Sequence, residues 1–234
     1  MNILAIDTSN HTLGIALLQD DKVVGEYITN MKKNHSVRAM PAIEQLMKEC
    51  GLKPNQLDKI VVAKGPGSYT GVRIGVTIAK TLAWTLGIPL SGVSSLKALA
   101  ANGAYFSGYI SPLFDARRGQ IYTGLYKQEE EGLVCVKEDQ ILQSSDWATI
   151  LAKLDGPVLF IGEDIPLHKE VLEEALEDRA IFADPSCMNP RPGALAVLGK
   201  DMENEDIHTF VPNYVRLAEA EANWLKEQKK KSAE

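Results

Sequence analysis

The sequence predicts an α/β protein of two lobes, in which one order of strands and helices occurs twice. Three strands followed by alternating helices and strands are expected in residues 1–108, and the same order starts again at residue 109. A chain of 234 residues buries roughly 70–75% of the surface that it exposes when unfolded, which suffices for one large core or two smaller ones. The composition, 45% hydrophobic and 24% charged, is that of a globular protein and excludes disordered, collagen-like and disulfide-stapled classes.

The elements of the first lobe are indicated by apolar runs and by helical periodicity. Its strands are expected at residues 3–7, 13–18, 23–28, 60–63 and 89–93. Its helices are expected over residues 36–50, 70–86 and 95–104. Gly51 and Gly87 mark the ends of the first two helices, because glycine readily takes the left-handed conformation that follows a helix.

The elements of the second lobe repeat this order. Strands are expected at residues 109–114, 120–126, 134–142 and 158–161, and helices over 145–154, 167–176, 190–202 and 217–230. Three meandering strands followed by alternating helices and strands are typical of a ribonuclease-H-like lobe, and two such lobes in tandem make the actin-like (ASKHA) architecture. We therefore predict an N-terminal lobe at residues 1–108 and a C-terminal lobe at 109–234, with its last helices packing back on the first lobe.

Charge is distributed unevenly along the chain. Residues 1–110 carry 11 basic and 7 acidic side chains, whereas residues 111–234 carry 14 and 24, for a net charge of −6. A protein that binds nucleic acid directly usually has a basic surplus, so this class is disfavoured. The longest apolar run, residues 194–198, is too short to cross a bilayer, and no basic, signal-like region precedes the first strand. We expect a cytoplasmic protein without membrane association.

Polar residues follow the first strand of each lobe. Asp7, Thr8 and Ser9 stand at the carboxyl end of the first strand, and Asp115 stands at the corresponding place in the second lobe. Because open α/β sheets bind ligands at the carboxyl ends of strands, these four residues are candidate nucleotide contacts. The alternative is a turn in which such side chains bond their own backbone. Arg117 and Arg118 follow Asp115 and suit either a phosphate or a partner carboxylate.

A glycine-rich segment at residues 65–71 joins a strand to a helix. It lacks the lysine of a P-loop. Its backbone N–H groups could cradle an anion at the helix N-terminus, or the segment could be a tight turn in which Ser68 or Thr70 caps the helix. The residues alone leave both interpretations open.

The helix that follows carries a face of small residues. Gly71, Gly75, Ala79 and Ala83 recur every four residues and leave a groove that another helix could approach closely. Either an element of the same chain or a partner protein could fill it. The first helix, with Val37, Met40 and Met47 on one face and His35 at its start, would belong to the same partner interface.

Metal chemistry has little support in the sequence. The four histidines, His11, His35, His168 and His208, lie far apart, and none has a second histidine or a thiol at ligand spacing. Cys50, Cys135 and Cys187 form no C-x-x-C pair. We therefore expect no metal site and no redox motif.

Five segments together resemble the bacterial TsaB (YeaZ) family over nearly the whole chain. They are DTS at residues 7–9, HS at 35–36, GPGSYTGVRIG at 65–75, DARRG at 115–119 and VPNYVR at 211–216. GPGSYTGVRIG followed by DARRG is the specific part of this signature. The resemblance implies an actin-like fold and a role in forming N6-threonylcarbamoyladenosine (t6A) at position 37 of tRNAs that read codons beginning with A.

The resemblance also implies partners. In that pathway the paralogue TsaD transfers the threonylcarbamoyl group from threonylcarbamoyl-adenylate to tRNA, assisted by TsaB and the ATPase TsaE. TsaD holds its metal with an H-x-x-x-H pair, which this sequence lacks. We expect an accessory, non-catalytic subunit that binds TsaD, forms a homodimer when TsaD is absent, and meets tRNA through the complex. ATP or ADP at the complex interface is the one cofactor left open. Many relatives carry a G-x-G near residues 162–164, and Asp164 departs from it, which argues against nucleotide binding by this chain alone.

The alternative function is a free-standing actin-like ATPase or small-molecule kinase. It would use Asp7, Thr8 and Asp115 around a nucleotide–metal complex.

Overall fold

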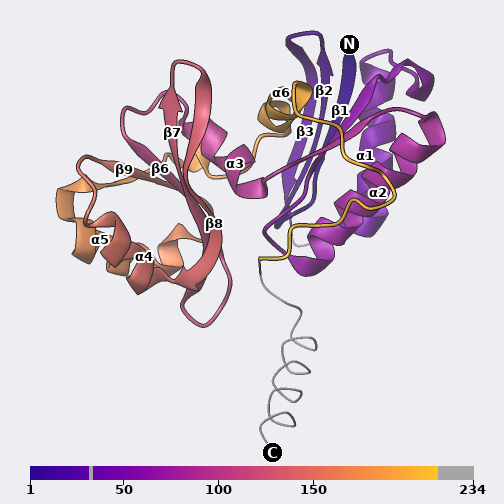
Figure 1. The fold of residues 1–234 in the computed structure, drawn as a ribbon. Helices are drawn as coiled ribbons and strands as arrows, with labels where there is room; N and C mark the ends of the chain where they lie inside the picture. The colour runs from indigo at the N-terminus through magenta and orange to yellow at the C-terminus, as the bar shows by residue number, and fades with distance from the viewer. Residues whose placement is uncertain (32–33, 216–234) are drawn as a thin grey trace, which may run out of the picture.

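The computed structural model describes residues 1–31 and 34–215, which form two five-stranded sheets flanked by helices (Figure 1). In the N-terminal sheet the strands are β1 (Asn2–Asp7), β2 (Thr12–Gln19), β3 (Lys22–Asn30), β4 (Lys59–Ala63) and β5 (Leu90–Val93). In the C-terminal sheet they are β6 (Tyr109–Asp115), β7 (Gln120–Glu129), β8 (Gly132–Gln143), β9 (Val158–Ile161) and β10 (Ala180–Phe182).

The two sheets have the same topology. The strand orders are β3-β2-β1-β4-β5 and, written in the same sense, β8-β7-β6-β9-β10. In each sheet the first three strands pair antiparallel and the last two are added in parallel. This repetition confirms the tandem actin-like fold that the sequence predicts.

Helices cover the outer face of each sheet. α1 (His35–Glu49) and α2 (Tyr69–Leu86) lie on one side of the N-terminal sheet, away from the other lobe (Figure 1). Their apolar faces form one core with β1, β2 and β4. In the C-terminal lobe, α4 (Ser144–Leu151) and α5 (Lys169–Leu176) pack on the sheet around Trp147 and Phe160, both fully buried.

Two helices lie between the sheets. α3 (Ser95–Ala100) packs on β6 and β7 of the C-terminal sheet. α6 (Pro192–Lys200) returns to the N-terminal sheet, where Leu195 and Ala196 bury against β1, β2 and β4. The cut between domains after residue 108 stays a prediction, and the helix expected over 217–230 lies outside the described residues.

After α6, residues 201–215 form an extended segment that we call the C-terminal strap. Lys59 donates to the carbonyls of Lys200 and Met202, and Lys80 to that of Phe210. The N–H of Glu205 donates to the carbonyl of Leu90 on edge strand β5. The strap therefore closes one edge of the N-terminal sheet and leads the chain back to the start of α2. No helix in the described part of the chain is long and apolar enough to cross a membrane.

Candidate functional site

A cleft of about 1100 Å³ opens between the start of α2 and the turn after β6. The N-terminal lobe contributes residues of the β1–β2 turn and of the α2 N-terminus, and the C-terminal lobe contributes the β6–β7 turn. The strap ends at its rim. Its lining includes Asn10, His11, His35, Tyr69, Asp115, Arg117, Arg118, Asp164 and Tyr214.

Asp115 organises the turn on the C-terminal side of the cleft. Its Oδ2 accepts a hydrogen bond from the N–H of Arg117 at 3.1 Å, and its Oδ1 lies 3.1 Å from Nε2 of His168. His168 is buried, so it is an internal support for Asp115. The sequence gives no sign of this pair, because the two residues lie 53 positions apart.

The turn holds three consecutive residues in the left-handed region. The φ angles of Arg117, Arg118 and Gly119 are 66°, 56° and 74°. This conformation costs an arginine roughly 1–2 kcal/mol, whereas a glycine takes it freely. The turn therefore places two exposed arginines at the cleft at a cost in stability.

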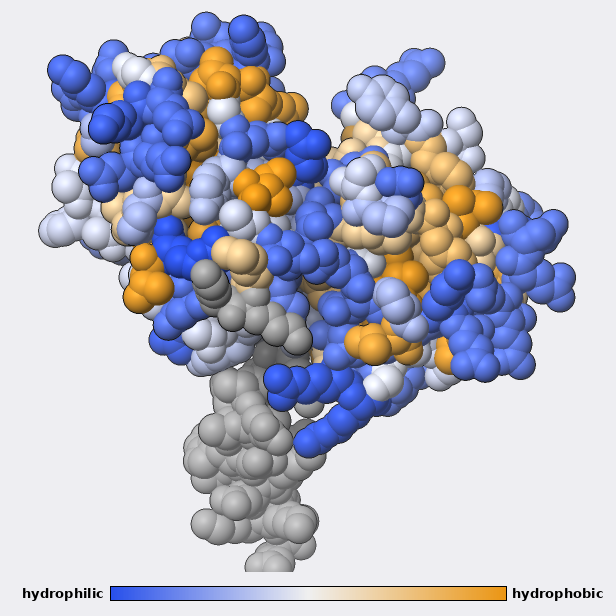
Figure 2. All heavy atoms as spheres, turned by 180° about the vertical axis from the view of Figure 1, so that it is seen from behind, coloured by the Kyte–Doolittle hydropathy of each residue, from blue (hydrophilic) through white to orange (hydrophobic). Residues whose placement is uncertain are grey.

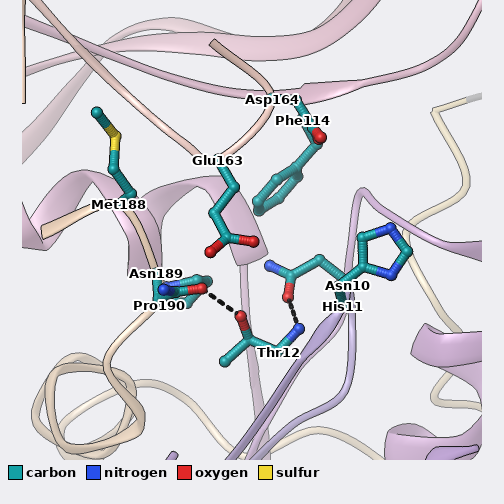
Figure 3. Close-up of a pocket in the computed structure, with 9 residues that line it drawn as sticks. All are labelled: Asn10, His11, Thr12, Phe114, Glu163, Asp164, Met188, Asn189 and Pro190. Atoms are coloured by element: carbon teal, nitrogen blue, oxygen red, sulfur yellow. Dashed lines mark hydrogen bonds between the residues drawn. The ribbon is translucent and has the colours of Figure 1, made fainter. Parts of the chain in front are cut away.

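The two acidic residues after β9 have different partners: Asp164 bonds within the C-terminal lobe, and Glu163 reaches the N-terminal lobe. Oδ2 of Asp164 accepts from the N–H of Asp115 at 2.9 Å, and Glu163 accepts a hydrogen bond from the amide of Asn30 on β3. Glu163 points into a hollow of about 20 Å³ beside Asn189, which bonds Thr12 (Figure 3). The Asn30–Glu163 hydrogen bond therefore links the ends of β3 and β9 across the lobes.

Three of the four candidate nucleotide contacts do not reach the cleft. Asp7, Thr8 and Ser9 are at most 2% exposed and do not line it, whereas Asp115 does. Oδ1 of Asp7 accepts hydrogen bonds from the N–H and the hydroxyl of Ser9. This is the alternative that the sequence allows, a turn in which polar side chains bond their own backbone. Burial raises the pKa of Asp7 above its ordinary value, and the two hydrogen bonds from Ser9 offset only part of that rise. Contrary to the expectation from the sequence, these three side chains do not face the cleft.

The glycine-rich segment at 65–71 is a tight turn with a cap. The side chain of Ser68 accepts from the N–H of Gly71 at 3.3 Å, as an N-cap does. The carbonyl of Ser9 accepts from the N–H of Ser68 and lies 2.2 Å from where a Cβ on Gly67 would be. The loop after β1 thus takes up the N–H of Ser68, while residues 66–71 also line the cleft.

The small-residue face of α2 packs within the chain. Ala79 and Ala83 are fully buried in the core beneath the helix. A Cβ on Gly71 would lie 2.2 Å from the carbonyl oxygen of Thr8, which leaves no room for a partner helix. The expected partner groove at Gly71, Gly75, Ala79 and Ala83 is therefore corrected to a core contact. The four-residue spacing predicts that this face packs closely against another element, but it does not identify that element.

The opposite faces of α1 and α2 remain exposed. Val37 and Met40 on α1 are 67% and 45% exposed, and Trp84 on α2 is 67% exposed. His35 is half-buried at the start of α1, whereas Met47 belongs to the core, a second correction to the expected interface. Seen from behind, both lobes show separate hydrophobic patches among mostly hydrophilic atoms (Figure 2).

A tyrosine pair stands where α2 meets the strap. The rings of Tyr69 and Tyr214 have centroids 5.2 Å apart, and the guanidinium of Arg73 lies over the Tyr69 ring and bonds its hydroxyl at 2.6 Å. This cluster fixes the end of the strap beside the cleft. Among residues 1–31 and 34–215, no three histidine, cysteine or acidic side chains lie together as metal ligands.

Comparisons with known proteins agree with this fold. The family model TsaD, described as tRNA N6-adenosine threonylcarbamoyltransferase, matches residues 22–224. The tRNA threonylcarbamoyladenosine biosynthesis protein TsaB of Bacillus subtilis (strain 168) is 59% identical over 98% of this chain and 100% of its own length. TsaB of Escherichia coli (strain K12) is 33% identical over 76% of this chain and 87% of its own.

A solved structure has the same architecture. YeaZ from Pseudomonas aeruginosa superposes with a TM-score of 0.78 at 24% identity, covering 91% of this chain and 99% of its own. The likeness therefore includes both sheets.

Proposed function

Since the chain belongs to the TsaB family of tRNA threonylcarbamoyladenosine biosynthesis proteins, we propose that it is the accessory, non-catalytic subunit of a cytoplasmic threonylcarbamoyl-transfer complex. Its partner is a TsaD-type transferase, which moves the threonylcarbamoyl group from threonylcarbamoyl-adenylate to adenosine 37 of tRNAs reading codons that begin with A. The ATPase TsaE completes the complex. tRNA contacts this chain through the complex, which accords with its net charge of −6.

The observation that carries this proposal is the exposed side of α1 and α2. Val37 and Met40 stand in solvent on a helix whose other face is fully used by the core. Large exposed apolar side chains on a helix are suited to a partner, because burying each one is worth about 1.5–3 kcal/mol. The docking face that we propose consists of His35, Val37 and Met40 on α1 with Trp84 on α2. The same face would serve the homodimer when TsaD is absent.

The alternative, a free-standing ATPase or kinase, has less support. It needs Asp7, Thr8 and Asp115 around a nucleotide, and only Asp115 lines the cleft. Asp115 is itself engaged by His168 and by the Arg117 N–H. In this proposal ATP or ADP binds at the interface of the assembled complex and not to this chain alone.

The experiment combines Val37→Glu and Met40→Glu in one variant. We expect it to fold as the unchanged protein does, because both positions are exposed. We expect it to bind the TsaD-type partner at least about tenfold more weakly, since a buried unpaired charge costs several kcal/mol. Affinity is measured by calorimetry with the purified partner, and t6A by nucleoside analysis of tRNA from cells carrying each variant.

The matched control is Val197→Glu, a valine that is 53% exposed on α6. It should leave both affinity and t6A unchanged. Equal binding by the double variant and the unchanged protein would show that the docking face lies elsewhere. Transfer of threonylcarbamoyl by this chain alone would contradict the accessory role itself.

A further inference from the structure

The last residue of β1 and the three that follow it, Asp7 to Asn10, form a four-residue segment that we call the β1 loop. It carries the DTS segment that the sequence marks as a nucleotide contact, yet Asp7, Thr8 and Ser9 are buried. Polar side chains are costly to bury without a bonding role. The contacts of this loop show what that role is.

The β1 loop holds the start of α2. The carbonyl of Ser9 accepts from the N–H of Ser68, the N-cap, at 2.7 Å, and the hydroxyl of Thr8 donates to the carbonyl of Gly71 at 2.7 Å. Gly67 and Gly71 have no space for a Cβ, because one would come within 2.2 Å of the carbonyl oxygens of Ser9 and Thr8. The first turn of α2 is thus placed directly on the loop.

The same loop holds the start of α1. Nε2 of His35, the first residue of the helix, lies 2.8 Å from the carbonyl oxygen of Asn10. A carbonyl oxygen only accepts, so Nε2 carries the proton of this hydrogen bond. His35 stands two residues before Val37 and five before Met40, so the bond fixes the end of the helix that carries the exposed apolar side chains.

Asp7 fixes the shape of the loop. Its Oδ1 accepts both the N–H of Ser9, at 2.8 Å, and the hydroxyl of Ser9, at 2.7 Å. Its Oδ2 is buried and has no hydrogen-bond partner, and neither has Nδ1 of His35. One oxygen of the carboxylate therefore carries the structural role, and an amide, which keeps one such oxygen, could replace it.

We propose that Asp7 is a positioning residue for the partner interface: through Ser9 and Asn10 it sets the starts of α1 and α2, and with them the docking face. This inference rests on the proposed function, because it takes these two helices as the surface that the TsaD-type partner binds. It gives the DTS segment a task that requires no nucleotide.

The test compares Asp7→Ala with Asp7→Asn in the full chain. Asp7→Ala removes the oxygen that accepts two hydrogen bonds from Ser9, so we expect partner affinity to fall about tenfold or more, in line with the loss of those two bonds. Asp7→Asn keeps that oxygen and should restore affinity to within about twofold of the unchanged protein. Rescue by the amide separates positioning from any role that needs a negative charge. Asp155→Ala, at an exposed site in the C-terminal lobe, is the control.

Three results would overturn the inference. One is a folded Asp7→Ala protein that binds the partner normally. Another is failure of Asp7→Asn to restore binding, which would mean that the charge itself is needed. If Asp7→Ala does not fold, Ser9→Ala is tested in its place. Normal partner binding by Ser9→Ala is the third result that would overturn the inference. If Val37→Glu with Met40→Glu loses binding while the Asp7 variants do not, only this inference fails. If none of the variants changes binding, the proposed docking face has failed as well.

Discussion

The hydroxyl oxygen of Thr8 lies 2.6 Å from the position that a Cβ on Gly75 would take. This approach presses the second turn of α2 against the β1 loop. Glycine in a helix interior costs about 0.5–1 kcal/mol relative to alanine, and here the close contact explains why it is present.

Gly75→Ala should therefore destabilise the protein, although alanine has the higher helix propensity. We expect a loss of about 1–3 kcal/mol, because the added methyl group overpacks the contact with Thr8. Urea denaturation measures it as a lower midpoint. Thr77→Ala, at an exposed position of the same helix, is the control, and an increase in stability for Gly75→Ala would contradict the packing described. Gly75→Leu should fail to fold, so it cannot serve as a probe of partner binding.

Asp7→Asn should stabilise the protein at neutral pH. Burial raises the pKa of Asp7 in the folded state above its ordinary value of 3.8. An acid whose pKa is higher in the folded than in the unfolded state stabilises the protein at a pH below its unfolded-state pKa. That stabilisation is lost as the pH rises through its folded-state pKa. The asparagine does not titrate, so the advantage of the variant should grow between pH 4 and pH 8. Each pKa unit is worth about 1.4 kcal/mol. Urea midpoints at several pH values provide the measurement, and a constant difference between the two proteins would contradict the raised pKa.

Ser94 and Asp139 should show coupled contributions to stability. Ser94 caps α3 and donates to Oδ2 of Asp139 on β8 at 2.5 Å, while Tyr126 donates to Oδ1 at 2.5 Å. Ser94→Ala should cost about 1–3 kcal/mol, since it removes both a helix cap and a bond to a half-buried carboxylate. In a double-mutant cycle with Asp139→Asn we expect a coupling energy of about 0.5–3 kcal/mol. Additive losses would show that the two residues act independently.

The purified chain should show no ATP turnover that depends on Mg²⁺. Asp7, Thr8 and Ser9 are buried, and side chains bridge the lobes where β3 and β9 end. Phosphate release is compared with that of Asp115→Asn, the variant at the candidate contact that lines the cleft. Turnover by the unchanged protein that Asp115→Asn abolishes would favour the kinase or ATPase alternative.

Local sequence patterns were sufficient to predict most of the fold. The run at 60–63 became β4, Gly87 ends α2 in the left-handed conformation, and the repeated order of elements appears as two sheets of one topology. β10, only three residues long, has no periodicity of its own and exists because it pairs with β9.

The site was harder to predict, because its contacts are long-range. A four-residue spacing shows that one face of α2 is bare, but it does not show that this face packs on β4, the strand just before the helix, and on β1, which is remote in the sequence. Likewise the turn at Asp115 depends on His168. Residue type identified the important segments, and their tasks follow only from the tertiary contacts.

The return of α6 and the strap to the first sheet has a consequence for synthesis on the ribosome. Chains emerge N-terminus first, and domains generally fold as units during translation. All strands of the C-terminal sheet lie within residues 109–182, a contiguous stretch. The inner face of the N-terminal sheet, however, is covered by Leu195 and Ala196, and its β5 edge by Glu205. The lobe that is made first is therefore completed last. A nascent chain that ends near residue 182 lacks both α6 and the strap, so the apolar face that Leu195 and Ala196 later cover is still open.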